Sequence, residues 1–506
     1  MINIVTDSQP QGTVISAKLS SSESVLAMTT EQLQHRFANS SISRLDVQIN
    51  DLLNRRRALC NYRQMLVTLL SPVRRLPYEL LGEIFRYCLP QNYNMEGAHK
   101  AVMLPSHVCK HWRDVALSIP ALWTNIVLHV TNETFEPRKA LVTAWFSRSG
   151  GLPLSFTLTG GENVLPILDF LLQYCGRWRY VNLSIPVETL RCLEAAKGHL
   201  QRLETIQINS GYRRTVYSIE HVLESAPNLW KVSLSGQKFI WSGLSGSWAQ
   251  LTELYVGYPL YTVGGCLALL QSARNLQKLS ILVGKGDVEG HHHFVFSHPL
   301  VSLHVWESGD YGIFNHITLP NLRDLIVDEI YSDWPQSQFI SFLARSSSPL
   351  QSFSLAVPTE RGDSDMWDDN MIQILQHTPS LHSLCLRYGF CEWIEGSLWK
   401  RLSPRVSDNG QVDCLLPKLN TISIQVDCQL TNLDYTALAD MILSRCSLAR
   451  NSNTIPTPIE RIQKVEVKCF YDESLDAVDD TMWHKEVSEQ LSPLQEVVDT
   501  VDVVIL

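Results

Sequence analysis

Apolar residues recur with one three-point spacing through most of the second half of the chain. An apolar residue is followed by others three and five positions later, in about eleven copies, and the clearest copies start 22, 25, 24 and 22 residues apart. The clearest copies are Leu229/Val232/Leu234, Leu251/Leu254/Val256, Leu276/Leu279/Ile281, Leu300/Leu303/Val305 and Leu322/Leu325/Val327. Fainter copies are Trp178/Val181/Leu183, Leu203/Ile206/Ile208, Leu350/Phe353/Leu355, Leu381/Leu384/Leu386, Leu419/Ile422/Ile424 and Ile462/Val465/Val467.

A helical stretch precedes many of these copies, as in His221 to Ala226, Cys266 to Ala273, Phe339 to Arg345 and Met371 to His377. One strand and one helix cannot bury their apolar faces alone, so the copies must stack on one another. The period is that of leucine-rich repeats, and it predicts one α/β solenoid with a parallel sheet. A set of ordinary αβ units is the alternative interpretation.

The later copies start further apart, which predicts inserted loops at Pro358 to Asp369 and at Leu402 to Asp413. Such insertions usually map to one face of an array, often the binding face. An open array end needs a polar outer layer, so the acidic stretch from Tyr471 to Leu506 is expected to include a terminal cap. We therefore assign residues 178–506 to a leucine-rich-repeat-like solenoid with a C-terminal cap, and residues 126–177 to a linking αβ segment.

The N-terminal part of the chain has two different patterns. Residues 1–29 are rich in Ser, Thr and Gln and poor in large apolar groups, which predicts a flexible tail. In residues 30–71 apolar residues follow alternating three- and four-residue steps, which predicts one amphipathic helix. This helix either docks on the next domain or associates with itself as a short coiled coil, and Arg56 and Arg63 within the apolar series favour docking. The series is Ile42, Leu45, Ile49, Leu52, Leu59 and Leu66.

Residues 72–125 form a separate helical unit, because Ser71-Pro72 ends the preceding helix. Leu76-Pro77 opens one helix and Pro105-Ser106 opens a second, and residues 121–123 can form a last short turn before an extended segment. With the solenoid that follows, these helices make the whole chain α+β. In the first helix, apolar residues recur at one- and three-residue steps, at Leu80, Leu81, Ile84, Phe85 and Cys88. In the second, Val108, Cys109, Trp112, Val115 and Ala116 share a face.

Three segments of this unit resemble the F-box-like domain of proteins that are common in mushroom-forming fungi. They are Leu76-Pro-Tyr-Glu-Leu-Leu-Gly-Glu-Ile-Phe85, Val108-Cys-Lys-His-Trp-Arg-Asp-Val-Ala116 and Leu122-Trp123. The resemblance implies a three-helix platform that leaves apolar side chains exposed for a Skp-type adaptor, which links it to a cullin-RING ligase. The implied adaptor-binding residues are Leu76, Pro77, Leu80, Ile84, Leu122 and Trp123, and the implied F-box core residues are Phe85, Val108, Cys109 and Trp112.

This resemblance implies a substrate-recognition subunit of an SCF-type (Skp adaptor, cullin, F-box) ubiquitin ligase, in which the F-box binds the adaptor and the repeats bind an unknown protein target. The chain itself would not be an enzyme. Two alternatives remain: a non-ligase interaction scaffold built on the repeats, and a helical cap on the array that has no partner. An enzyme would need titratable side chains that converge in a pocket.

Composition narrows the partners. The net charge of −9 and the pI near 6.0 give no attraction for phosphate backbones or acidic membrane surfaces, so neither nucleic acid nor membrane is an expected partner. Neither a signal peptide nor an apolar run long enough to span a membrane is evident. The 12 cysteines include no Cys-x-x-Cys pair, which indicates reduced, mostly buried thiols in the cytoplasm and/or nucleus.

Candidate metal and catalytic motifs are weak. His291, His292 and His293 are adjacent, which rarely allows imidazoles to converge on one ion, and no Cys or acidic partner is spaced beside them. Asp363, Asp365, Asp368 and Asp369 lack the glycine and final glutamate of an EF-hand. No phosphate-binding loop or nucleophile elbow occurs. We expect no catalytic residue, no metal and no cofactor.

Overall fold

The computed structural model describes most of the chain, with gaps, and the chain divides into two compact units, residues 1–84 and 85–506. The described residues are 14–70, 72–89, 98–131, 135–211, 218–236, 248–284, 295–308, 312–328, 336–357, 364–388, 393–394, 397–406, 412–427, 432–450, 459–470 and 480–505.

The first unit consists mainly of one long helix, α1 (Val14–Leu70), followed by the 3-10 turn η1 (Pro72–Arg75). The predicted helix over residues 30–71 is present, but α1 begins 16 residues earlier, so residues 14–29 are helical where a flexible tail is predicted. The physical reason is that neither Gly nor Pro occurs between Gly12 and Pro72, so nothing in that span stops a helix. The side chains of α1 that the structure describes are all exposed.

Four short helical elements follow: α2 (Tyr78–Tyr87), α3 (Ala98–Val108), α4 (Lys110–Ser118) and the 3-10 helix η2 (Pro120–Trp123). The second helix predicted from Pro105 is thus two helices. Helix α3 begins seven residues before Pro105 and contains it, and α4 begins after a break at Cys109. This break changes which side chains share a face.

The second unit is built on a 14-stranded sheet in which every pair of neighbouring strands is parallel. The strands follow one another in the sheet in chain order. They are β1 (Asn125–Val130), β2 (Leu154–Gly160), β3 (Trp178–Ser184), β4 (Thr205–Asn209), β5 (Lys231–Ser235), β6 (Glu253–Tyr261), β7 (Lys278–Gly284), β9 (Ser302–Ser308), β11 (Asp324–Asp328), β12 (Ser352–Val357), β13 (Ser383–Tyr388), β17 (Thr421–Asp427), β19 (Lys464–Phe470) and β20 (Thr500–Ile505).

The three-point spacing explains the register of this sheet. The residues at the +3 position pair across successive strands, as in Val232 with Leu254 and Leu254 with Leu279, and the +5 residues form a second row. All three residues of each of the eleven copies are buried. A buried Leu or Ile contributes roughly 1.5–3 kcal/mol. The core is therefore continuous along one face of the sheet.

The sheet begins earlier than the predicted array. Strands β1 and β2 belong to the same sheet as the later strands, so residues 126–177 do not form a separate linking segment. Trp123, Ile126 and Leu128 repeat the +3/+5 spacing and are all buried. We call the buried apolar residues of this spacing the anchors of the sheet. The final turn of the helical region therefore supplies the first anchor, Trp123.

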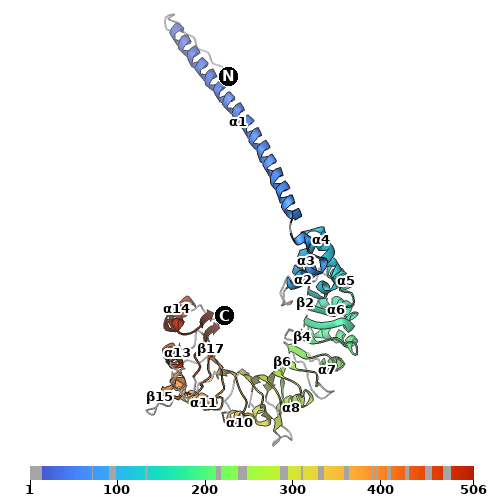
Figure 1. Cartoon of the computed structure of the whole chain (residues 1–506), viewed down its shortest axis with the longest axis vertical. Helices are drawn as coiled ribbons and strands as arrows, with labels where there is room; N and C mark the ends of the chain where they lie inside the picture. The colour runs from blue at the N-terminus through green and yellow to red at the C-terminus, as the bar shows by residue number, and fades with distance from the viewer. Residues whose placement is uncertain are drawn as a thin grey trace, which may run out of the picture. The chain divides into compact units, whose positions relative to one another are not determined.

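Helices lie along one face of the sheet (Figure 1). Where a loop is predicted at Pro358 to Asp369, helix α11 begins at Ser364, so the second half of that segment is helical. Among the described residues after β1, the helices are α5 (Phe135–Arg148), α6 (Leu165–Leu172), α7 (Glu220–Leu223), α8 (Val263–Ser272), α9 (Ile313–His316), α10 (Gln336–Ser346), α11 (Ser364–Gln376), α12 (Ser397–Leu402), α13 (Tyr435–Arg450) and α14 (Asp480–Leu491), with 3-10 helices η3 (Glu162–Val164), η4 (Cys175–Arg177), η5 (Val187–Ala196) and η7 (Ser492–Glu496). The short strand pairs are β8 (Phe296–Ser297) with β10 (Ile317–Thr318), β14 (Trp393–Ile394) with β18 (Asn432–Leu433), and β15 (Arg405–Val406) with β16 (Val412–Asp413).

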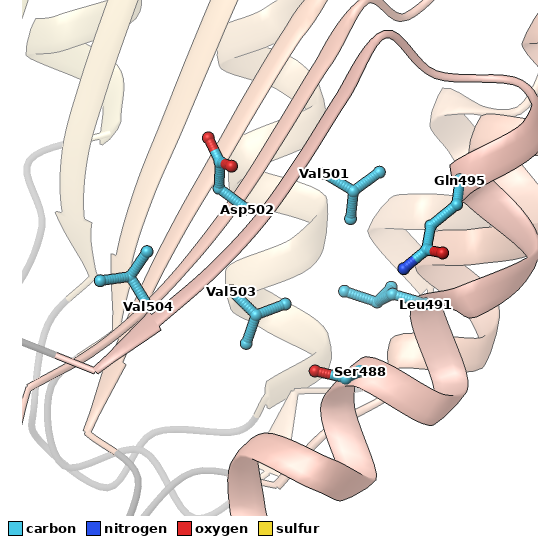
Figure 2. Close-up of a pocket in the computed structure, with 7 residues that line it drawn as sticks. All are labelled: Ser488, Leu491, Gln495, Val501, Asp502, Val503 and Val504. Carbon is cyan, nitrogen blue, oxygen red and sulfur yellow. The ribbon is translucent and has the colours of Figure 1, made fainter.

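The C-terminal end of the sheet differs from the predicted polar cap. Strand β20 adds one more parallel strand, and Val501 and Val503 are only half-buried, whereas their register partners Val465 and Val467 are fully buried. A shallow pocket of about 260 Å³ lies between β20 and α14, as Figure 2 shows. In the described part of the chain, the terminal layer is therefore a strand with an incompletely covered apolar side.

Candidate functional site

Helix α2 carries two apolar faces. Leu81 and Phe85 are buried, while Leu80 is 52% exposed and Ile84 is 42% exposed. Because positions one helical turn apart share a face, Leu80 and Ile84 form one exposed apolar stripe. Pro77, just before the helix, is also exposed, and its carbonyl accepts the first helical hydrogen bond from the Leu81 amide at 3.1 Å.

The structure places the six predicted adaptor-binding residues in two groups. Pro77, Leu80 and Ile84 are exposed and Leu76 is half-buried, so these four are accessible to a partner. Leu122 and Trp123 are fully buried, so the prediction that they stay exposed is wrong. The indole Nε1 of Trp123 donates to the Ala116 carbonyl at 2.9 Å, and its ring packs edge-on against Trp145 of α5, with ring centroids 4.7 Å apart.

Of the four predicted F-box core residues, three are buried or half-buried and one is exposed. Phe85 is buried, and its ring packs on half-buried Trp112 with centroids 5.0 Å apart. Half-buried Cys109 caps α4, and its Sγ accepts a hydrogen bond from the Trp112 amide at 3.5 Å. Val108 is 60% exposed, so its assignment to the core is wrong. The extended backbone at Cys109 interrupts the helix and turns Val108 away from the face shared by Trp112, Val115 and Ala116.

A second candidate site lies on the sheet face opposite the buried anchors. It consists of Tyr255, His304, Trp306, Asp328 and Arg387, which we call the sheet-face cluster. Nε2 of His304 lies 2.7 Å from Oδ2 of Asp328, and the Arg387 guanidinium pairs with the other carboxylate oxygen. The His304 and Trp306 rings lie with centroids 3.8 Å apart, and Tyr255 packs edge-on against Trp306 at 5.5 Å.

Small residues on the intervening strands make these contacts possible. Arg387 on β13 reaches Asp328 on β11 by crossing β12, where its register partner is Ala356. Tyr255 on β6 reaches Trp306 on β9 by crossing β7, where its register partner is Ser280. Alternate strands are about 9–10 Å apart, a span that only long side chains can bridge.

The electrostatics of the sheet-face cluster keep His304 neutral near pH 7. Burial lowers the pKa of His304 to about 4, and the positive charge of Arg387 adds to the effect. Because an ionised carboxylate only accepts hydrogen bonds, the neutral imidazole donates from Nε2 to Asp328. Burial also lowers the pKa of Arg387, although an arginine stays charged at neutral pH. The cluster thus combines the ion pair of Asp328 and Arg387 with the aromatic pair of Tyr255 and Trp306.

A row of ion pairs continues the polar surface toward the N-terminal strands. Glu253 on β6 accepts from Lys231 on β5 and from Lys278 on β7, each at 2.8 Å. Burial works against ionisation of Glu253, but the hydrogen bonds from the two lysines outweigh it and lower the pKa of this carboxyl. Lys278 also interacts electrostatically with Asp324 of β11, so a second carboxyl group contributes to the charge balance of this row.

Sequence reasoning missed the sheet-face cluster, although the pattern contains a signal for it. In an extended strand the residues at +4 and +6 point away from the buried +3 and +5 positions. His304 and Trp306 occupy +4 and +6 of the copy that starts at Leu300, and Asp328 and Arg387 occupy +6 of later copies. The spacing places these side chains on the face opposite the buried +3 and +5 residues, but it does not tell which of them meet across strands, nor that Asp328 is buried there.

Two kinds of feature are absent from the described residues. Within these ranges no group of three or more His, Cys, Asp or Glu side chains is placed to hold a metal ion, and no helix is long and apolar enough to cross a bilayer. His291 to His293 lie outside the described residues, and so do the side chains of Asp363, Asp365 and Asp368, while Asp369 is exposed. A second shallow pocket, of about 360 Å³, is lined by Thr159, Gly160, Ser184, Ile185, Pro186, Asn209 and Gly211, which include no titratable side chain.

Comparison with known proteins identifies one region. Residues 73–129 match the F-box-like family model, and this match confirms the domain predicted from the three motif segments at nearly the same bounds. No curated protein sequence matches the chain. The F-box-like match indicates an adaptor-binding role of the kind that F-box domains have in SCF-type ligases.

Proposed function

We propose that this chain is the substrate-recognition subunit of an SCF-type ubiquitin ligase. Its F-box-like region binds a Skp-type adaptor, which connects it to a cullin-RING ligase, and the sheet unit binds a protein target. The chemistry then belongs to other subunits, and the chain acts in the cytoplasm and/or nucleus without a cofactor. The F-box-like match at residues 73–129 carries this proposal.

The exposed stripe of α2 supports the adaptor contact. Apolar side chains gain free energy when a partner removes them from water, and Leu80 and Ile84 are half exposed on a helix whose opposite side is buried. Leu76 and Pro77 extend the stripe at its N-terminal end. Leu122 and Trp123 take no part in the contact, because they are buried inside the second unit.

The regular sheet supports a leucine-rich-repeat-like solenoid as the target-binding part. Its strands follow chain order, and the Thr252 carbonyl accepts from two successive amides, Gln277 and Lys278, a pattern repeated by Gln277 and Val301 in the next turns. Such arrays bind partners on extended, exposed surfaces. Tyr, Trp and Arg are enriched at binding hot spots, and the sheet-face cluster contains one of each.

The adaptor contact is tested with purified full-length chain and a purified Skp-type adaptor. The double variant Leu80→Asp/Ile84→Asp is compared with the control Leu152→Asp. Leu152 is 39% exposed, a fraction similar to the 42% of Ile84, but it lies outside residues 73–129. We expect the double variant to lose at least tenfold in affinity and the control to bind like the parent, with unchanged circular dichroism for both. If the parent does not bind the adaptor, the chain is a non-ligase scaffold and the proposal is wrong.

A further inference from the structure

Helix α1 carries an apolar seam that nothing in the described first unit covers. The apolar residues of this seam are between 40% exposed, at Leu66, and 70% exposed, at Leu70. They follow a strict seven-residue repeat over four heptads, a distance of about 42 Å along the helix axis. First-position residues are Ile42, Ile49, Arg56, Arg63 and Leu70, and fourth-position residues are Leu45, Leu52, Leu59 and Leu66.

The period itself identifies the kind of partner. A straight helix that packs on a globular domain repeats its apolar face every 3.6 residues, whereas a seam that holds 3.5 residues over several heptads faces another helix of the same period. The described part of the chain contains one helix long enough to match, which is α1 itself. A second copy of the chain therefore presents a matching seam.

The length and composition of α1 also favour a second copy of the chain as the partner. Most helical stability in proteins comes from packing of an amphipathic face, not from intrinsic propensity. Helix α1 spans 57 residues, many of them Ser, Thr or Asn, and its described side chains are all exposed. The Asp51–Arg55 ion pair at 3.0 Å is solvent-exposed, so it contributes little. Burial of the seam against a partner helix supplies the missing packing.

We propose that two copies of this chain associate through residues 42–70 of α1 as a parallel two-stranded coiled coil. Ile at the first heptad position together with Leu at the fourth favours two parallel strands. Arg56 and Arg63 agree with two strands and not more, because in a two-stranded coil the arginine stem lies along the seam while its charge reaches water. In a larger bundle the same guanidinium would be enclosed.

The oligomeric state of the full-length chain tests this proposal by light scattering after size-exclusion chromatography. We expect a mass twice the 57.4 kDa of one chain at about 20 µM. Leu45→Glu/Leu52→Glu should give a monomer with reduced far-ultraviolet circular dichroism, since two charges enter the seam. Val47→Glu is the matched control, because Val47 is 69% exposed but lies outside the seam, and it should remain a dimer.

A gain-of-function variant separates the seam from general surface stickiness. Arg56→Leu removes one of the two like-charge pairs from the seam, the other being that of Arg63, so the dimer dissociation constant should fall at least tenfold. Leu45→Cys should form a disulfide-linked dimer under mild oxidation and Val47→Cys should not, since fourth-position residues face each other only in a parallel pair. A monomeric parent, a trimer or larger assembly, a dimer unaffected by the glutamates, or a dimer without the Leu45→Cys crosslink would each overturn the proposal.

Discussion

Helix α1 and the parallel sheet use the same apolar residue types at equally regular spacings, but with opposite results. In the sheet, each +3 and +5 residue is covered by the next strand and by the helices on that face, so the eleven copies are fully buried. In α1, Ile42, Leu45, Ile49 and Leu52 remain more than half exposed. Regular spacing alone therefore does not decide whether a face is buried.

The difference lies in what the chain supplies next to each element. Within the 14-stranded sheet, every strand between the edge strands β1 and β20 has a parallel neighbour on both sides, which is how stacked arrays become their own partners. A lone helix has no such neighbour along its own chain. The exposed stripes of α1 and α2 are therefore available to other chains, whereas the buried anchors of the sheet stabilise the fold.

The largest expected effect separates an anchor from an exposed aromatic residue. Trp123→Ala should lower the free energy of unfolding by about 3–5 kcal/mol, because it leaves a cavity where the helical region meets β1. Tyr87→Ala should cost less than about 1 kcal/mol, since Tyr87 is 88% exposed. Urea unfolding followed by circular dichroism measures both, and equal losses would contradict the assignment of Trp123 as an anchor.

The next effect concerns binding and not folding. Changing Leu76 and Pro77 together to alanine should weaken adaptor binding by about 2–4 kcal/mol, or thirty- to a thousandfold, because both begin the exposed stripe. The melting temperature should change little, since neither side chain is fully buried. Calorimetric titration with a Skp-type adaptor and circular dichroism melting of both proteins give the two numbers. Undiminished binding, or binding lost only through unfolding, would remove these residues from the adaptor surface.

A pH effect of intermediate size distinguishes the two faces of the sheet. The pKa of His304 is about 4 in the folded protein and near 6.5 in an unfolded chain, so the unfolded state takes up a proton first as pH falls. Stability from this group is complete above pH 6.5 and declines toward pH 4, by about 2 kcal/mol between pH 7 and pH 5. His304→Gln keeps a donor for Asp328 without titrating, so it should lack that part of the decline in urea unfolding. An equal decline in both proteins would show that His304 does not carry it.

The smallest effect is expected in α1. Leu45→Ala should change the stability of the sheet unit by less than about 0.5 kcal/mol, because Leu45 is 55% exposed and lies in the other unit. Leu279→Ala, at a buried anchor, should cost about 2–5 kcal/mol in the same assay. A large loss from Leu45→Ala would mean that α1 supports the sheet and would remove the contrast between the two regions.

The helical region shows where sequence reasoning succeeds and where it fails. The motif identified α2 and the F-box-like domain, because a short helix with Pro at its start and apolar residues one turn apart is a local feature. It assigned Leu122 and Trp123 to the wrong environment, because their burial depends on Trp145 in the following helix. It placed Val108 in the core because a break at Cys109 is not evident from apolar spacing.

The sequence by itself determined the positions of the eleven strands, the part of the long helix over residues 30–70, and the F-box-like motif, since each follows from spacings within a few residues. Tertiary structure decided that β1 and β2 belong to the same sheet, that Trp123 is its first anchor, and that Asp328 and Arg387 meet across β12. Local spacing sets the direction in which a side chain points along its own element. What that side chain meets depends on strand order and register, which bring together residues from distant parts of the chain.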